Sequence, residues 1–324
     1  MIAFGPVPSR RLGRSLGINH IPPKVCTYSC IYCQVGRTNR LRTGRCPFLG
    51  VPAVVEAAVE KLEAARRSGE PVDYLTFVPD GEPTLDAELG SMIDALRSLG
   101  IPIAVVTNGS LLDHADVREE LTGADWVSLK VDTVDEARWR QVNRAHGRLR
   151  LPRILDGMQE FAAGFDGRLV TETMLLAGLN DAERQLRAAA SFIATLKPTT
   201  AYLAVPTRPP AEPWVRPATP PSITRAYEVF RALVGRVELL IGYEGDAFAA
   251  TGDPKEDLLA ITAVHPMREQ AVARFLRRTG ASPSIVAELV QRGELIEVAY
   301  GGHRYIMRPT ARGENVTIEK GRAR

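Results

Sequence analysis

The chain reads Cys26-Thr27-Tyr28-Ser29-Cys30-Ile31-Tyr32-Cys33 near its start, which spaces three cysteines as C-x3-C-x2-C. Three thiolates can bind three irons of a four-iron cluster and leave the fourth iron open, whereas a structural cluster normally has four cysteine ligands. The alternative is a zinc site or a redox pair, but zinc sites usually join one C-x2-C pair to a second, distant pair. The one further cysteine, Cys46, is either a fourth ligand that closes the cluster or a thiol without a metal. The spacing favours a cluster with one open iron.

Composition and charge restrict the class of protein. Of the 324 residues, 45% are hydrophobic and 24% are charged, as in ordinary globular proteins. No apolar run approaches the roughly 18 residues that span a membrane, and no signal peptide is apparent. An oxygen-sensitive cluster needs a reducing compartment, so we expect a cytoplasmic protein. The net charge of +3 is too small to predict nucleic-acid binding by the whole chain.

Apolar strand-like runs alternate with amphipathic helical stretches up to about residue 245. Continuous apolar runs such as Ile103-Ala104-Val105-Val106 are typical of parallel strands. The alternation predicts an α/β fold, and the pattern alone leaves open whether the sheet is a closed barrel or doubly wound. Predicted helices cover residues 53–67, 85–99 and 182–196. Predicted strands cover residues 15–19, 72–78, 101–107, 126–131, 169–176, 200–205 and 237–243.

The pattern changes after residue 253. Three predicted helices at 256–264, 268–278 and 283–291 precede a hairpin at 295–308, which turns at Gly301-Gly302. Three helices and a hairpin are the order of a winged-helix domain, so we assign residues 1–255 to one domain and 256–310 to a small winged-helix-like domain. The polar residues 311–324 are expected to form a loose tail.

A second motif, Pro79-Asp80-Gly81-Glu82-Pro83-Thr84, directly follows the strand predicted at 72–78. Glycine at the carboxyl edge of a sheet allows a ligand to approach the backbone closely. The alternative is an ordinary strand-to-helix turn in which Thr84 caps the helix predicted at 85–99.

Polar side chains also end the next strands. Asn108 follows the strand at 101–107, and Ser128, Lys130 and Asp132 share one face of the strand that follows it. A buried charge there is costly without a polar partner. Glu172 on the strand at 169–176 is a candidate to pair with Lys130, or to contact a substrate.

The cysteine run, the Gly-Glu-Pro turn and the N-terminal phrase Gly5-Pro6-Val7-Pro8-Ser9-Arg10-Arg11-Leu12-Gly13-Arg14 together resemble the radical S-adenosylmethionine (SAM) superfamily. Over about residues 2–250 the chain resembles a widespread prokaryotic group described as Fe–S oxidoreductases, related to the wyosine-forming tRNA enzymes. Those enzymes carry a second cluster on extra cysteines. The four cysteines of this chain leave no set for a second cluster, so the wyosine reaction itself is not implied.

The resemblance implies a partial (β/α)6 barrel, open on one side. It implies one [4Fe-4S] cluster with Cys26, Cys30 and Cys33 as ligands and SAM on the open iron, and an external one-electron donor of the flavodoxin or ferredoxin type. Asp80 departs from the usual motif, in which a glycine often stands at that position. The residues that the resemblance places at SAM are Tyr32, Gly81, Glu82, Pro83, Asn108, Ser128 and Lys130.

The substrate is less well determined. Arginines precede and follow the cysteines, so either the surface is simply basic or an anionic substrate approaches the cluster. We expect an enzyme acting on an anionic, phosphorylated small molecule or an RNA base. The alternative is a redox sensor or nucleic-acid-binding protein that uses the winged helix. The arginines are Arg10, Arg11, Arg14, Arg37, Arg40, Arg42 and Arg45.

The proline-rich segment 206–221 also has two interpretations. It is a linker, or a stiff loop at the carboxyl end of the sheet in which Arg208 and Trp214 contact substrate.

Overall fold

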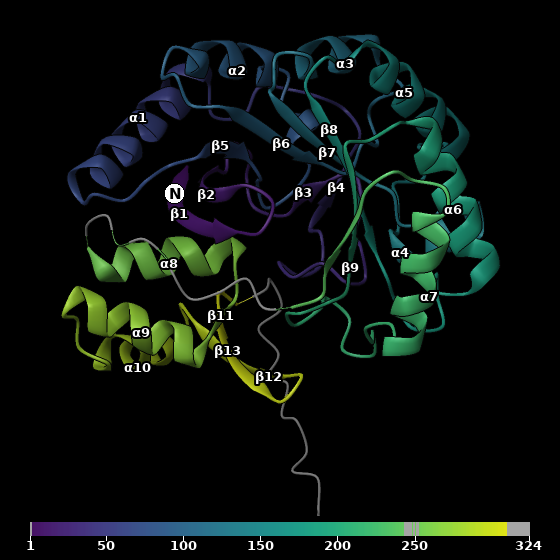
Figure 1. Ribbon diagram of the computed structural model, residues 1–324. Helices are drawn as coiled ribbons and strands as arrows, with labels where there is room; N and C mark the ends of the chain where they lie inside the picture. The colour runs from purple at the N-terminus through teal and green to yellow at the C-terminus, as the bar shows by residue number, and fades with distance from the viewer. Residues whose placement is uncertain (1, 243–247, 249, 251–252, 310–324) are drawn as a thin grey trace, which may run out of the picture.

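A computed structural model describes residues 2–242, 248, 250 and 253–309 (Figure 1). The expected tail at 311–324 and the end of the strand predicted at 237–243 lie outside these residues. Among the described helices, none is both long and apolar enough to cross a bilayer.

Within the described residues, a sheet of eight strands curls into a half barrel (Figure 1). Seven strands are parallel, and β1 runs antiparallel to β2 at one edge. The strands, in their order across the sheet, are β1 (Ala3–Ser9), β2 (Gly13–Ile18), β5 (Tyr74–Phe77), β6 (Ile103–Thr107), β7 (Trp126–Lys130), β8 (Arg168–Met174), β9 (Thr200–Ala204) and β10 (Val237–Leu240).

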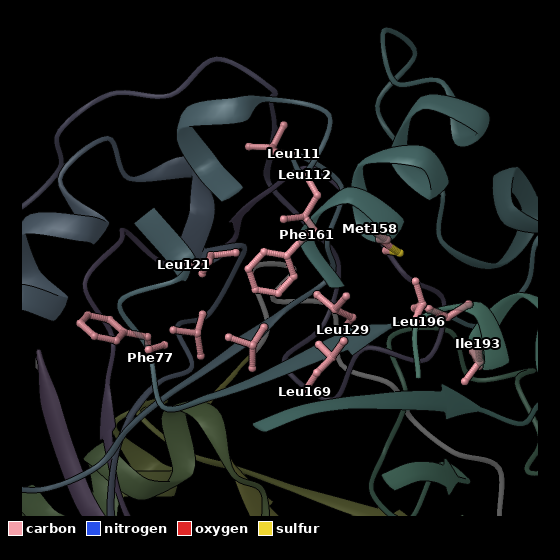
Figure 2. Packing of buried hydrophobic residues seen from close by; sticks show 14 of the residues in the cluster. Phe77, Leu111, Leu112, Leu121, Leu129, Met158, Phe161, Leu169, Ile193 and Leu196 are labelled. Atoms are coloured by element: carbon pink, nitrogen blue, oxygen red, sulfur yellow. The ribbon is translucent and has the colours of Figure 1, made fainter. Parts of the chain in front are cut away.

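Helices cover the outer, convex face of the sheet (Figure 1). Figure 2 shows the core between the two layers, where Leu129 and Leu169 of the strands lie near Phe161 of a helix. The helices are α1 (Val51–Arg67), α2 (Leu89–Arg97), α3 (Ala115–Leu121), α4 (Glu136–Val142), α5 (Leu151–Gly164), α6 (Glu183–Thr195) and α7 (Pro220–Arg231).

The first helix shows how the sequence specifies this layer. Val54, Ala58, Leu62 and Ala65 recur every three to four residues and are all buried, so α1 presents one apolar stripe to the sheet. Burial of each large side chain contributes about 1.5–3 kcal/mol.

The inner face of the curl changes character along the strands. Trp126, Val170 and Tyr202 form an apolar floor with their neighbours. Alternation along a strand puts Ser128 and Lys130 on the same face as Trp126, nearer the carboxyl end. The sheet is therefore apolar inside at its amino end and polar at its carboxyl end.

The predicted strands and the partial barrel agree with this architecture, but the helix predicted at 85–99 begins in the wrong place. A 3-10 helix, η1 (Pro83–Leu85), occupies its start, and α2 begins only at Leu89. Thr84 is not a helix N-cap. Its backbone N–H donates to Glu82 Oε1 at 3.1 Å, so the carboxylate of the motif caps the turn.

The C-terminal residues form a second, smaller unit. Its three-stranded antiparallel sheet has the order β11-β13-β12, and Gly301 and Gly302 turn the hairpin with φ of 55° and 77°. Its elements are α8 (Pro254–Val264), β11 (Met267–Arg268), α9 (Glu269–Thr279), α10 (Ser284–Gln291), β12 (Ile296–Tyr300) and β13 (His303–Met307).

This unit lies against the edge of the half barrel formed by β1 (Figure 1). Ala260 of α8 packs with Phe4 of β1. Lys61 of α1 also donates to Asp257 of α8 at 2.6 Å. The edge strand of the sheet is thereby covered, which protects it from pairing with other chains.

His20 gives the fold a measurable acid sensitivity. The imidazole is fully buried, with Nε2 3.2 Å from the carbonyl oxygen of Pro83, and burial lowers its pKa to about 4. The unfolded state, with a His pKa of about 6.5, binds the proton more tightly, so stability falls as pH drops from about 6.5 to about 4. We expect His20→Gln to remove about 2 kcal/mol of the stability lost between pH 7 and pH 5.

Urea unfolding of the cluster-free protein at the two pH values measures this difference. The glutamine amide can still donate to Pro83, so the comparison isolates titration of the ring. Equal losses for the wild type and the variant would exclude His20 as the source.

Candidate functional site

The carboxyl ends of the strands surround a cavity of about 320 Å³ inside the half barrel. Two loops and the strand ends form its wall, as expected where parallel strands end at one edge. Pro83 is not among the described residues that line the cavity. Its carbonyl oxygen lies 3.2 Å from His20 Nε2. The predicted residues that do line the cavity are Cys26, Cys30, Cys33, Tyr32, Gly81, Glu82, Asn108, Ser128 and Lys130.

The loop that carries the cysteines is held by backbone hydrogen bonds on both sides. Its first part, β3 (Val25–Cys26), pairs with β4 (Arg40–Leu41). Its middle part donates from the Ile31 N–H to the Val142 carbonyl at 3.0 Å. The loop is therefore held by hydrogen bonds to other parts of the chain.

The three thiols of the cysteine run line one cavity. Thiolates are the ligands that iron–sulfur clusters use, and in a cluster each sulfur binds a different iron. The donor set and the cavity therefore fit an iron–sulfur cluster.

The environment of the sulfurs also fits this centre. Burial raises the pKa of the Cys26 thiol and raises that of Cys30 to about 12, so both are neutral until a metal binds. Asn108 Nδ2 lies 3.7 Å from Cys26 Sγ, and Asn143 Nδ2 lies 3.4 Å from Cys30 Sγ. Such N–H donors to sulfur are one of the means by which proteins adjust cluster potentials.

Gly81 is required by contact with the cysteine loop. A Cβ at this position would lie 1.8 Å from the carbonyl oxygen of Val25, the residue before Cys26. The segments are also joined by Lys24 N–H to Asp80 O at 2.8 Å and Glu82 N–H to Val25 O at 3.2 Å. The motif after β5 thus holds the cysteine loop in place.

The carboxylate of Glu82 is buried and accepts hydrogen bonds from other residues of the chain. Oε2 accepts from the Asn108 N–H at 2.8 Å, and Oε1 accepts from the hydroxyls of Thr84 (2.7 Å) and Thr107. Burial raises the pKa of this carboxyl, although these hydrogen bonds oppose the shift. The carboxylate fixes the motif to the end of β6, which orients Asn108.

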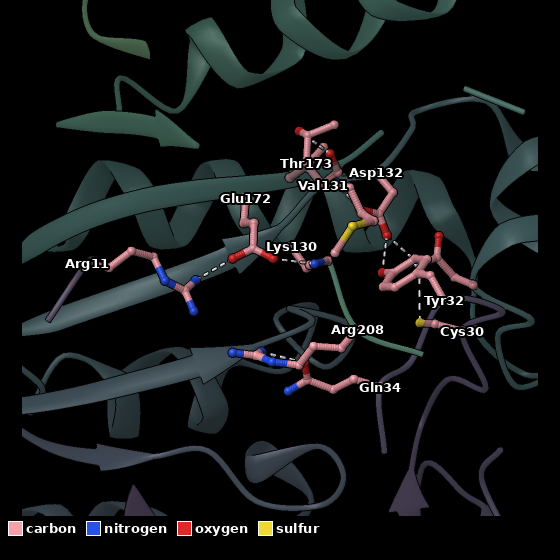
Figure 3. Close-up of polar contacts among 12 residues, drawn as sticks. Arg11, Cys30, Tyr32, Gln34, Lys130, Val131, Asp132, Glu172, Thr173 and Arg208 are labelled. Carbon is pink, nitrogen blue, oxygen red and sulfur yellow. Dashed lines mark hydrogen bonds and ion pairs between the residues drawn. The ribbon is translucent and has the colours of Figure 1, made fainter. Parts of the chain in front are cut away.

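Lys130 and Glu172 form the ion pair anticipated from the sequence, and Arg11 joins it (Figure 3). Although burial alone would raise the pKa of Glu172, Lys130 and Arg11 outweigh it and hold the pKa at about 2. Burial lowers the pKa of Lys130, but the carboxylates of Glu172 and Asp132 reverse this to a net rise. Both groups are therefore charged at neutral pH.

Two residues absent from the predicted site organise its far side. The hydroxyl of Tyr32 donates to Asp132 (Figure 3). Asn143 donates to Asp132 Oδ2 at 2.7 Å. Asp132 Oδ1 also accepts from the Met174 N–H at 2.9 Å. Asp132 could have been assigned to the site from the sequence, because it shares a strand face with Ser128 and Lys130. Asn143 lies on no motif.

Most of the arginines around the cysteines have internal partners. Arg37 makes two hydrogen bonds to Glu212 at 2.7 and 2.8 Å, and Arg45 pairs with Asp116 and Glu120. Arg14 pairs with Glu70. Of the seven, Arg10 and Arg11 line the cavity as described, so the cluster of arginines in the sequence mainly reflects structural ion pairs.

The proline-rich segment 206–221 is a loop at the carboxyl end of the sheet, continuing into α7. Arg208 lines the cavity and donates to Gln34 Oε1 at 2.7 Å (Figure 3). Its Nη2 lies 2.8 Å from His265 Nε2. Trp214 is 50% exposed and is not part of the described lining.

A curled parallel sheet whose carboxyl edge combines three cysteines with a Gly-Glu-Pro turn defines a class of SAM-dependent iron–sulfur proteins. Residues 21–189 match the family model described as Radical SAM superfamily, and the chain belongs to this superfamily. Its members are generally enzymes that use SAM and an iron–sulfur cluster.

The chain is also similar to several proteins that are named UPF0026. One from Methanocaldococcus jannaschii is 43% identical over 98% of this chain and 99% of its own length. Another from Synechocystis is 36% identical over 64% of this chain and 76% of its own. A radical SAM methyltransferase from Sphaerobacter thermophilus shares the fold, with a TM-score of 0.54, 18% identity, and coverage of 74% of this chain and 70% of that one.

The contact between Gly81 and Val25 predicts a severe effect of Gly81→Ala. The added methyl group collides with backbone, which cannot rotate away, so the cysteine loop must move. We expect anaerobic reconstitution to load less than a fifth of the iron that the wild type binds, measured as iron per chain and by absorbance of the cluster.

Gly164→Ala is the matched control, because nothing lies within 4 Å of a Cβ there. It should load iron normally. Full loading of Gly81→Ala would contradict the close approach.

Proposed function

We propose that the protein is a radical SAM enzyme with a single [4Fe-4S] cluster held by Cys26, Cys30 and Cys33. When bound, the cluster and SAM supply reductive cleavage of SAM to a 5′-deoxyadenosyl radical, which abstracts hydrogen from a substrate. The observation that carries the proposal is the convergence of the three thiols and the Gly81 segment on one cavity. Cys46 is outside the described lining, which disfavours it as a fourth ligand.

The other site residues hold and enclose the cofactor. Tyr32, with Lys130 5.0 Å from its ring centre, offers a fixed aromatic wall for the adenine of SAM. Asn108, Ser128 and Lys130 offer polar atoms for the ribose and carboxylate, and the backbone at Gly81 and Glu82 offers polar atoms for the amino group. Pro83 contributes only by shaping this turn.

The substrate we propose is anionic, either a phosphorylated small molecule or an RNA base. The support is the positive charge of the wall, which includes Arg10, Arg11 and Arg208. An external flavodoxin- or ferredoxin-type donor supplies the electron. A reducing, cytoplasmic location follows from the oxygen sensitivity of the cluster.

We propose further that the C-terminal unit is a winged helix that covers the barrel. The order helix, strand, helix, helix, strand, strand and the sheet order β11-β13-β12 support this. The hydroxyls of Tyr300 and Tyr305 donate to the carbonyls of Pro206 and Thr207 at 3.1 and 2.7 Å. In the alternative, a nucleic-acid-binding redox sensor, α10 would enter the groove, but it carries Glu288 and no lysine or arginine.

Release of 5′-deoxyadenosine tests the enzyme class. After anaerobic reconstitution and reduction with dithionite, we expect uncoupled turnover of SAM to release it even without substrate. The variant with Cys26, Cys30 and Cys33 all changed to alanine is the control. Release no greater than that of the control would refute the proposal.

Hydrogen exchange tests the covering role of the C-terminal unit. Tyr300→Phe with Tyr305→Phe removes two hydrogen bonds, each contributing about 1 kcal/mol, from the segment at 206–208. We expect the amides of Thr207 and Arg208 to exchange at least fivefold faster, with unchanged iron content. Amides of α6, remote from this contact, should exchange as in the wild type. Unchanged rates at 207 and 208 would show that the tyrosines do not hold the loop.

A further inference from the structure

Two charged atoms in the cavity wall make no hydrogen bond within the described part of the chain. Lys24 Nζ and Asp80 Oδ1 are both shielded from solvent and have no hydrogen-bond partner among the described residues. Buried charges in proteins are normally paired, and each exception calls for an explanation. Neither residue belongs to the cofactor contacts described above.

The backbone fixes both residues beside each other. The Lys24 N–H donates to the Asp80 carbonyl at 2.8 Å, and the Lys24 carbonyl accepts from Asn39 and Arg40, both at 3.1 Å. Asp80 N–H donates to Asn19 Oδ1 at 3.2 Å. Lys24 also has a φ of 64°, a left-handed conformation that is unfavourable for a lysine and that these bonds maintain.

The cavity that the pair lines is the one that the cysteines line: Lys24 and Asp80 stand in the same wall as Cys26 and Cys33. Burial lowers the pKa of Lys24, and the carboxylate of Asp80 opposes this shift. A four-iron cluster with three thiolate ligands carries a net negative charge, which grows by one unit on reduction. A nearby ammonium favours the reduced state, and a nearby carboxylate opposes it. Net charge around a cluster is one of the determinants of its potential.

We propose that Lys24 and Asp80 are an electrostatic pair that sets the potential at which the cluster accepts its electron. Lys24 raises the potential, and Asp80 partly offsets Lys24. One electron passes from a low-potential one-electron donor to the cluster, and no bond of the protein forms or breaks. This inference rests on the proposed function, because it requires a cluster at Cys26, Cys30 and Cys33.

The pair also accounts for the departure of this motif from the usual glycine. Asp80 is tolerated because its backbone contacts do not need a glycine: its carbonyl accepts from the Lys24 N–H and its N–H donates to Asn19 Oδ1. Its side chain lines the same cavity as Lys24. A glycine there would keep the backbone contacts and leave the ammonium without its counter-charge.

Anaerobic redox titration of the reconstituted protein, followed by electron paramagnetic resonance of the reduced cluster, tests the proposal. Titration at pH 8 keeps Asp80 ionised, because burial raises its pKa to about 6. We expect Lys24→Met to shift the midpoint potential downward and Asp80→Asn to shift it upward. Lys24→Arg keeps the charge and should stay near the wild type.

Opposite shifts from the two variants distinguish electrostatics from a structural disturbance. Shifts of the same sign, or none, would overturn the proposal. Should Lys24→Met fail to load iron, the nearly isosteric Asp80→Asn decides alone, by the sign of its shift. A wild type that binds iron and cleaves SAM while the variants show no shift removes only this inference. A wild type that does neither removes the proposed function.

Discussion

The close contact between the Gly81 backbone and the Val25 carbonyl is the constraint on which the site depends. It joins the segment after β5 to the cysteine loop at a separation that no side chain permits. The flanking hydrogen bonds at Lys24 and Glu82 then fix the register of the two segments. Because Glu82 binds the end of β6, this contact also places Asn108 against Cys26. Three separate stretches of the chain therefore take their positions from one packing contact.

Two carboxylates in and near the cavity each pair with two cations. Glu172 holds Lys130 and Arg11, so two cations lie in the wall with a single carboxylate between them. Glu212 does the same for Arg37 and Arg144 on the outer side of the cysteine loop. A buried charge is tolerated when its partner is near, and removal of one partner is more harmful than removal of both. Each of these two carboxylates therefore offsets the charge of two cations.

The sequence was most informative where chemistry restricts the residue type. Cysteine spacing, the Gly-Glu-Pro turn and continuous apolar strands predicted the superfamily, the half barrel and a set of residues that line the cavity. The start of α2 was misplaced because Glu82, rather than Thr84, caps the turn, and that choice depends on the distant Thr107 and Asn108. The arginines could not be interpreted from spacing, since their carboxylate partners lie far away in the chain. Asn143 could not be found at all, because nothing local marks an amide that will meet a sulfur.

The loop at Pro206–Arg208 has two neighbours of different origin. Gln34, which directly follows Cys33, accepts a hydrogen bond from Arg208. The C-terminal unit contacts the same loop through His265, Tyr300 and Tyr305. Thermodynamic coupling between two binding events is reciprocal. If occupation of the cysteine loop steadies Arg208, docking of the C-terminal unit must strengthen by the same free energy. Any ligand that steadies Arg208 would therefore also favour docking of the C-terminal unit, whose hydrogen bonds reach the same loop.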